Sequence, residues 1–180
     1  MLKLTIPGRE LFDDEKEEFI ETQATTITLE HSLVSLSRWE SKWEKSFLAT
    51  QDKSTEETLD YIRCMILNDE IPDDLLDRLD DEILGKIFEY IDAKMTATTF
   101  GDIGNKPAGR EIVTAEIIYH WMVAMNVPQE FENWHLSRLI TLLKVISAKN
   151  APPKKRSAQD LAARNRQLNA ERRAAMNSPG

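Results

Sequence analysis

The sequence has few of the residues that build disulfides and metal sites, with one cysteine and three histidines among 180 residues. The lone cysteine, Cys64, excludes an internal disulfide, and its place in an apolar helical pattern predicts a small buried residue. No apolar run approaches the roughly 18 residues of a membrane-spanning helix, and the N-terminus MLKLTIPGRE lacks the apolar core of a secretion signal. We therefore expect a protein of the cytoplasm that does not enter a membrane.

Residues for catalysis and metal binding do not form a recognisable set. Glu116 and His120 have the i, i+4 spacing of two metal ligands on a helix, but two ligands without a third favour a polar helix edge. His135, next to Trp134 at a predicted helix start, is expected to cap or pack. No local motif indicates a Ser/His/Asp set, although such triads are defined by geometry rather than sequence order. We predict no catalytic residue, no cofactor and no metal.

Glycines are also few, and their one cluster, FGDIGNKP at residues 100–107, does not have the form of a phosphate-binding loop. A P-loop requires Lys followed by Ser or Thr at the start of a helix, whereas Lys106 precedes Pro107. We interpret the segment as a surface loop or as a mobile partner-binding loop, because long loops in compact domains are often functional. The acidic residues between 69 and 82 lack the glycine and terminal glutamate of an EF-hand, and their spacing among leucines predicts a solvated helix face.

Charge is distributed unevenly along the chain. The formal net charge is −8, but residues 149–180 hold eight Lys or Arg and two acids, about +6, which leaves about −14 for residues 1–148. An acidic body disfavours nucleic-acid binding. The basic tail is expected either to bind an anionic partner or to fold back on the body.

Two short N-terminal segments have the alternation of strands. Leu2–Ile6 alternates apolar and polar residues and stops at Pro7-Gly8, and Thr25–Leu29 is rich in β-branched residues. Residues 10–21 are strongly acidic and are interpreted as a connector or a poorly packed hairpin arm. A β-element this small needs a helix packed on it.

Apolar residues recur at three- and four-residue spacing in most of the chain between residues 33 and 148. A capping box, Ser54 followed by Glu57, opens one of these stretches, and Pro72 precedes another that is expected to be one helix or two pieces. The predicted helices cover about 33–47, 54–66, 76–91, 113–126 and 133–148. Four methionines are expected as core filler or as an adaptable binding surface: Met65, Met95, Met122 and Met125. The predicted fold class is therefore α+β, mainly α, with a β-element of two or three strands packed on about five helices.

Pro152 and Pro153 exclude the interior of a helix or strand, and three adjacent cations come directly after them. We predict one globular domain over residues 1–148, followed by a basic linker and tail over 149–180. Within the domain, residues 1–31 form the β-element and residues 32–148 the helical bundle.

The end of the tail, residues 157–176, contains good helix formers but little to hold a helix in place. Leu161 and Leu168 are its only large apolar residues before Met176, and a stripe so thin cannot anchor a helix on a core. We expect a flexible segment, weakly helical or disordered, that becomes helical on a partner.

Trp39 and Trp43 lie one turn apart on the first predicted helix. One interpretation places both in the core, because a buried Trp contributes a large apolar area. The other places them on the surface as anchors for a partner, because Trp is enriched at binding hot spots.

Two segments resemble the tail assembly chaperones of tailed bacteriophages: TLEHSLVSLSRWESKWEKSFL at residues 28–48 and YIRCM at residues 61–65. The segment RNRQLNAERR at 164–173 also resembles the end of many of these proteins. The resemblance implies a non-enzymatic protein of the host cell cytoplasm that binds the tape-measure protein, keeps it soluble and helps tail-tube subunits assemble around it. A homo-oligomer is one option, as is a second, frameshift-extended form.

Two alternatives to the chaperone hypothesis remain open. The first is a minor tail or connector protein that stays in the virion, and the second is a nucleic-acid-binding regulator that uses the basic tail, which the acidic body disfavours. Under the chaperone hypothesis, the residues expected to contact the partner are Trp39, Trp43, Lys154, Lys155, Arg156, Arg164, Arg166, Leu168, Arg172 and Arg173.

Overall fold

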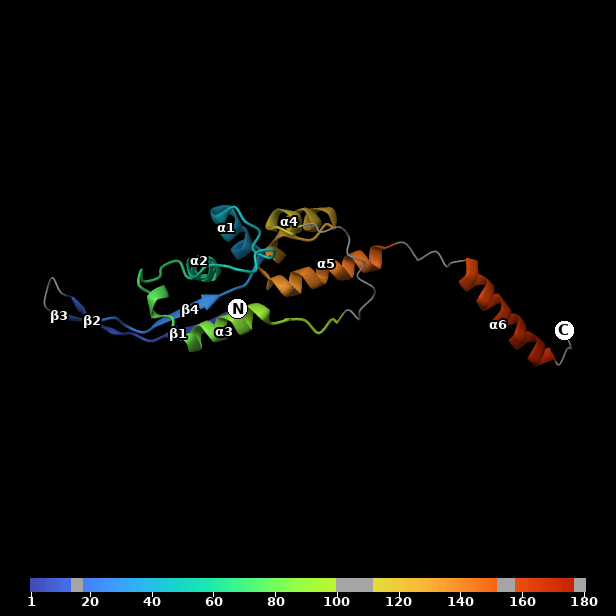
Figure 1. The fold of residues 1–180 in the computed structure, drawn as a ribbon, viewed down its shortest axis with the longest axis horizontal. Coiled ribbons are helices and arrows are strands. Elements are labelled where there is room, and N and C mark those ends of the chain that lie inside the picture. Colours follow the sequence, from blue (N-terminus) through green and yellow to red (C-terminus); the bar gives the residue numbers. More distant parts are fainter. Residues whose placement is uncertain (14–17, 100–111, 152–157, 177–180) are drawn as a thin grey trace. The chain divides into compact units, whose positions relative to one another are not determined.

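A computed structural model describes residues 1–13, 18–99, 112–151 and 158–176. The chain divides into two compact units, residues 1–147 and residues 148–180, and each is described by itself. The first unit is mainly helical with a small antiparallel β-element, so the predicted fold class is confirmed (Figure 1). Among the described helices, none combines the length and the apolar content needed to span a membrane.

The β-element is a ribbon of two chain segments. Strand β1 (Leu2–Ile6) pairs antiparallel with β4 (Thr25–Leu29), so that Leu2 lies opposite Leu29 and Ile6 opposite Thr25. The same two segments then form β2 (Glu10–Asp13) and β3 (Glu18–Glu21), which also pair antiparallel. Two two-stranded sheets therefore replace the predicted two or three strands, and the acidic segment expected as a connector or hairpin arm contains a hairpin.

Helices cover the ribbon because two strands alone bury too little apolar surface. Ile6, Ile27 and Leu29 are fully buried, and α3 (Asp81–Asp92) packs against β1. Asp80 caps α3, since its carboxylate accepts a hydrogen bond from the backbone N–H of Ile83 at 2.7 Å. The stripe predicted over residues 76–91 is split, because a 3₁₀ turn, η1 (Leu76–Arg78), precedes α3.

Helix α1 (Leu33–Trp43) is shorter than the predicted helix over 33–47. Glu44 has φ of 52°, a left-handed conformation that ends the helix. The chain then folds back, and the ring of Phe47 stacks on that of Tyr61 with centroids 3.8 Å apart. Phe47 is therefore part of the same apolar cluster, although it does not belong to α1.

Helix α2 (Thr55–Met65) begins with the predicted capping box, in which Ser54 and Glu57 each bond the other's backbone N–H. Cys64 is half-buried on α2 rather than buried as predicted, because it lies at an edge among Asp60, Lys42 and other charged side chains. This partial burial raises the pKa of the Cys64 thiol above its ordinary value.

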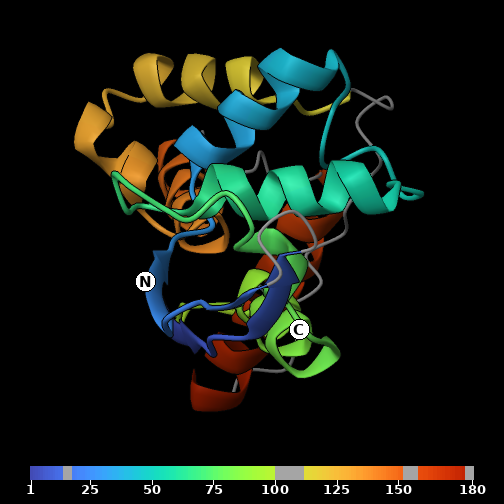
Figure 2. The same ribbon diagram turned by 90° about the vertical axis from the view of Figure 1, so that its left-hand side faces the viewer.

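The remaining helices of the first unit are α4 (Ala115–Ala124), a 3₁₀ turn η2 (Gln129–Asn133) and α5 (Leu136–Asn150). Helix α1 contacts both α2 and α4 and lies between them in Figure 2, whereas the ribbon and α3 lie on the other side of α2. Most of the predicted loop over 96–110 lies outside the described residues.

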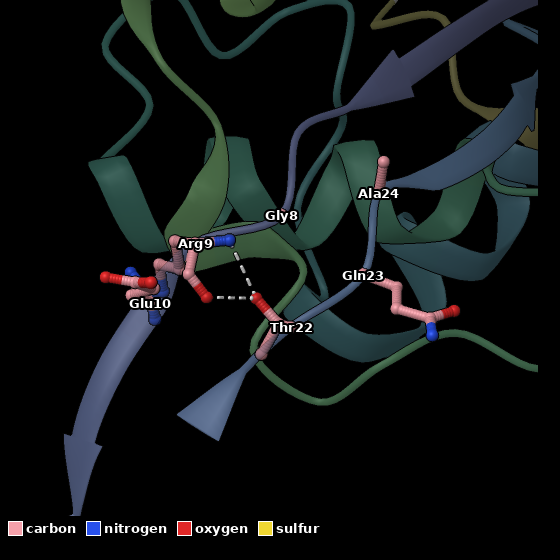
Figure 3. Close-up of a pocket in the computed structure, with 6 residues that line it drawn as sticks. All are labelled: Gly8, Arg9, Glu10, Thr22, Gln23 and Ala24. Carbon is pink, nitrogen blue, oxygen red and sulfur yellow. Dashed lines mark hydrogen bonds between the residues drawn. The ribbon is translucent and has the colours of Figure 1, made fainter. Parts of the chain in front are cut away.

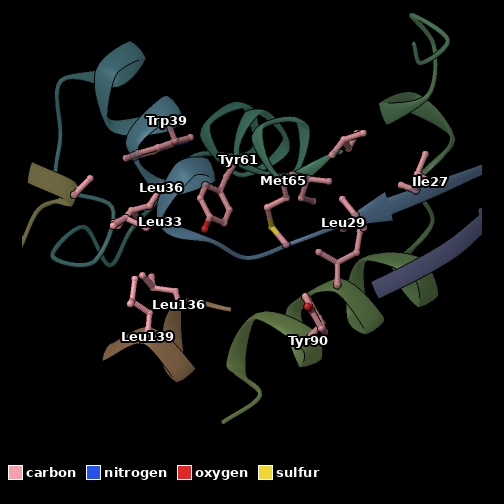
Figure 4. Packing of buried hydrophobic residues seen from close by; sticks show 14 of the residues in the cluster. Ile27, Leu29, Leu33, Leu36, Trp39, Tyr61, Met65, Tyr90, Leu136 and Leu139 are labelled. Carbon is pink, nitrogen blue, oxygen red and sulfur yellow. The ribbon is translucent and has the colours of Figure 1, made fainter. Parts of the chain in front are cut away.

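The core runs from the ribbon through α2 to α1 and α5 (Figure 4). Its largest fully buried side chain is Trp39. The other residues with no exposed surface are Ile6, Ile27, Leu29, Leu33, Leu36, Ile62, Met65, Leu75, Ile87, Ala115, Ile118 and Leu139. Of the four methionines, Met65 and Met122 are buried, Met125 is half-buried and Met95 is exposed.

The second unit contains α6 (Ala158–Met176), a continuous helix of 19 residues where a weakly helical or disordered segment was expected. Ala, Arg, Gln and Leu have high helix propensity, which favours a helix over these residues. Lys154, Lys155 and Arg156 lie outside the described residues.

Candidate functional site

Trp39 lies in the core, which agrees with the first of its two interpretations. Its ring has no exposed surface, and its indole N–H donates a hydrogen bond of 2.8 Å to the backbone carbonyl of Glu57. The ring of Phe47 meets it edge-on, with centroids 5.1 Å apart. Trp39 therefore joins α1 to α2 and presents no surface to a partner in this structure, although it was predicted as a contact residue.

Trp43 is half-buried one turn further along α1. Its ring stacks on Trp39 with centroids 6.2 Å apart, and its indole N–H donates to Asp60 Oδ2 at 2.9 Å. Lys42 pairs with the same carboxylate, and the ammonium groups of Lys42 and Lys45 lie 5.6 and 5.9 Å from the Trp43 ring. Of the two predicted tryptophan contacts, only Trp43 has an exposed edge, and cations surround it.

The described basic residues of the tail lie on two sides of α6. Arg164, Leu168 and Arg172 follow one another at spacings of four, so they share one face, which we call the 164/168/172 face. Arg166 and Arg173 lie on the opposite side of the helix, and all five side chains are exposed. Five of the ten residues predicted to contact a partner thus lie on α6, and three of them share one face.

Glu40 is a buried carboxylate on α1 that no sequence pattern had indicated. Its Oε1 accepts a hydrogen bond from the Phe47 N–H at 2.8 Å, and its Oε2 accepts one from the Ala115 N–H at 2.6 Å. Ala115 is the first residue of α4, where a negative charge stabilises the exposed N–H groups of the helix. Glu40 therefore positions α4 beside α1. No local pattern could have indicated this partner, because it lies 75 positions away.

Between α4 and α5 lies an apolar groove of about 270 Å³. Its lining residues are Trp121 of α4, Met125 at the C-terminal end of α4, and Ile140, Leu143, Lys144 and Ser147 of α5. Leu143 is buried, but Trp121, Met125 and Ile140 are only half-covered. Ile140 and Leu143 belong to the apolar periodicity of the predicted helix over 133–148, and Met125 was left open between core filler and binding surface, so periodicity did not indicate the groove. The one signal for it was that α5 has more apolar positions than a single buried face requires.

A buried aromatic cluster includes His31 between β4 and α1, Tyr61 of α2, Tyr90 of α3 and His135 directly before α5. His31 Nδ1 lies 2.5 Å from the Tyr61 hydroxyl oxygen, and the rings of His31 and His135 are 5.1 Å apart. His135 packs as predicted, with Nε2 3.0 Å from the backbone carbonyl oxygen of Tyr90. Burial, together with a smaller effect of the neighbouring His135, lowers the pKa of His31 to about 3. His31 is therefore a neutral core residue at physiological pH.

A polar hollow of about 430 Å³ marks the point where the ribbon passes from β1 to β2 (Figure 3). Thr22 Oγ1 accepts a hydrogen bond from the Arg9 N–H and donates one to the Arg9 carbonyl oxygen, each at 2.9 Å. The adjacent Gly8 lies against the Thr22 backbone so closely that a Cβ would fall 1.8 Å from its carbonyl oxygen. This backbone approach, which requires glycine, holds the two sides of the ribbon together.

Arg9 and Arg78 converge on Asp74 close to this hollow. Arg78 is buried, and its guanidinium lies 3.3 Å from Asp74 Oδ1 and donates to the Gln23 carbonyl oxygen at 3.1 Å. Arg9 approaches the other carboxylate oxygen at 3.9 Å. These contacts join Arg9 of the ribbon to Asp74, which lies before η1, and through it to Arg78 in η1. Asp74 is thus half-buried and paired, whereas most other acids between 69 and 82 are exposed. The predicted helix face is wrong for most of them, because α3 begins only at Asp81 and the preceding acids lie in loop and turn segments and in η1.

Within the described ranges, no three His, Cys, Asp or Glu side chains are grouped in a way that could hold a metal ion. Glu116 and His120 are both exposed on α4. In comparisons with known proteins, no family model, no curated protein and no solved structure matches the chain.

Proposed function

We propose that this protein is a non-enzymatic tail assembly chaperone of a tailed bacteriophage, which binds the tape-measure protein in the host cell cytoplasm and keeps it soluble. The sequence resemblance at residues 28–48, 61–65 and 164–173 points to this class. The single observation that carries the proposal is α6, an exposed basic helix in a unit separate from the acidic first unit. Binding of tail-tube subunits is a further expectation of the same proposal.

The 164/168/172 face supplies the chemistry for such contact. Arg164 and Arg172 can each donate two parallel hydrogen bonds to a carboxylate, a geometry that lysine lacks. Leu168 between them is 39% exposed and offers an apolar contact that α6 itself does not cover. An acidic helical segment of the client fits this arrangement, because its carboxylates would pair with the two arginines and its apolar side chains would cover Leu168.

The proposal is tested by producing the chain together with the tape-measure protein of the same phage. Soluble client is measured with and without the chain, and the complex is sized by gel filtration with light scattering. The proposal expects soluble client only in the presence of the chain. If the client stays insoluble and no complex forms, the proposal is wrong.

A matched pair of variants then locates the contact. Arg164→Ala/Arg172→Ala changes the 164/168/172 face, whereas Arg166→Ala/Arg173→Ala removes the same charge from the opposite side of α6. We expect the first variant to lose more soluble client than the second. Detection of the chain in purified phage particles would instead favour a structural protein of the virion.

A further inference from the structure

The groove between α4 and α5 has the form of a docking site for one more helix. Ile140, Lys144 and Ser147 follow one another along α5 at spacings of four and three. They form a wall about two helical turns long, or roughly 10 Å. Trp121 and Met125, four positions apart at the C-terminal end of α4, form the facing wall. Side chains at these helical spacings on both walls can accept the side chains of a third helix at positions i, i+3 or i+4, and i+7.

Lys144 gives the groove a charge opposite to that of the surrounding unit. It is the one charged side chain among the six lining residues, and it forms no ion pair with any residue in the described part of the chain. On its other side Lys144 borders a hollow that Asp92 and Lys94 also line, and those two charges offset each other. Helix α5 contains Arg138, Lys144 and Lys149 but no Asp or Glu.

We propose that this groove binds an amphipathic helix of another protein, with carboxylates beside its apolar stripe, and that Lys144 pairs with one of those carboxylates. The apolar stripe would cover Trp121, Met125 and Ile140, which the chain itself leaves half-covered. Met125 is unbranched and adapts to side chains of different shape. Helix α6 of a second copy is a poor occupant, because its arginines have the same charge as Lys144. The inference goes beyond the proposed function, since it assigns a surface and a ligand charge whichever protein supplies the helix.

Two synthetic peptides test the charge of the ligand. Both are about 18 residues long, enough for partial helicity, and share one leucine stripe, but one carries Glu and the other Lys beside it. Fluorescence anisotropy of each labelled peptide is measured while the full-length protein is added. We expect the Glu peptide to bind at least about tenfold more tightly than the Lys peptide, with the difference shrinking as salt is raised.

Matched variants test the location. Met125→Glu places a carboxylate in the groove and is expected to abolish binding of the Glu peptide. Val123→Glu is its control, because Val123 is 76% exposed on α4 and is not a lining residue. Lys144→Glu is expected to reverse the preference toward the Lys peptide, whereas Lys149→Glu, on the same helix but outside the groove, is expected to retain it. Circular dichroism and thermal unfolding verify that each variant is folded.

Equal affinity for both peptides, or loss of binding in Val123→Glu as in Met125→Glu, would overturn the inference. It would also be overturned if Met125→Glu converted an oligomer to monomer without any peptide binding, since a second copy would then occupy the groove. The solubility of the tape-measure protein with the unaltered chain reports on the proposed function separately, because it does not depend on the result of the peptide titration.

Discussion

The Nδ1 atom of His31 lies 2.5 Å from the Tyr61 hydroxyl oxygen, where β4 leads into α1. Tyr61 is buried, and its burial raises the pKa of the phenol, so the pair stays neutral across the physiological range. The titratable groups shown in contact with His31 are the Tyr61 hydroxyl and the ring of His135. A proton on His31 would therefore be buried beside a second imidazole, which disfavours the charged form.

This arrangement predicts that stability falls as pH falls. The pKa of His31 is lowered from 6.5 to about 3 on folding, so between these values the unfolded chain binds a proton that the folded chain does not. The His31 contribution is fully present above pH 6.5 and decreases by at most about 1.4 kcal/mol per pH unit below it. Urea unfolding at a series of pH values between about 7 and 4 measures the slope. His31→Asn should have a shallower slope, whereas His120→Asn, on the exposed side of α4, should keep it; equal slopes in all three proteins would contradict the prediction.

The ribbon junction gives a second prediction. Gly8→Ala should destabilise the first unit by roughly 2 kcal/mol or more, because a Cβ 1.8 Å from the Thr22 carbonyl oxygen forces the two backbones apart. Gly85→Ala is its control, since a Cβ at this position of α3 has no neighbouring atom within 4 Å. The control should gain about 0.5–1 kcal/mol from helix propensity. Chemical unfolding of both variants measures the difference, and the same sign for both would refute it.

The buried Glu40 gives a third prediction. Glu40→Ala should lower the free energy of unfolding by about 2–3 kcal/mol, because the N–H groups of Phe47 and Ala115 lose their common acceptor in a buried place. Glu40→Gln keeps one acceptor oxygen and should cost less. The exposed Glu89→Ala on α3 should change stability by no more than about 0.5 kcal/mol. If Glu40→Ala were as mild as Glu89→Ala in denaturant unfolding, the role of Glu40 as a link between α1 and α4 would be wrong.

Trp39 and Trp43 give a fourth prediction. Trp39→Phe removes a fully buried indole and its hydrogen bond to the Glu57 carbonyl oxygen, so it should cost roughly 2–3 kcal/mol. Trp43→Phe removes a half-buried indole whose partner, the partly buried Asp60 carboxylate, keeps its pairing with Lys42, so it should cost about 1 kcal/mol. Thermal unfolding monitored by circular dichroism compares the two variants. Equal losses of thermal stability in the two variants would contradict the prediction that Trp39 contributes more to the core than Trp43.

Structure set by short-range patterns could be predicted from the sequence. Alternation places the strands Leu2–Ile6 and Thr25–Leu29, and a capping box places the start of α2 at Ser54. These features depend on residues within a few positions of one another. Helix α6 is also a local outcome, and its propensity outweighed the thin apolar stripe that predicted a weak helix.

Features set by distant contacts could not be predicted in this way. The apolar spacing extends to Phe47, but the left-handed conformation of Glu44 ends α1, and Phe47 joins the core by folding back onto Tyr61. The apolar groove at Lys144 depends on how α4 and α5 pack, which periodicity within one helix does not specify. The acidic hairpin is a different case: its strands pair over a short range, but charged residues interrupt the alternation that would have indicated them.

The link from Glu40 to Ala115 has a consequence for how the protein is made. A ribosome adds about 5–20 residues each second, so several seconds pass before Glu40 meets a backbone partner that lies 75 positions later in the chain. The delay is longer still for the carbonyl oxygen of His31, which accepts a hydrogen bond of 2.7 Å from the N–H of Leu136. The segment from β4 to α1 therefore completes its contacts only when nearly the whole first unit has emerged from the ribosome, and until then its apolar side chains depend on partners that do not yet exist.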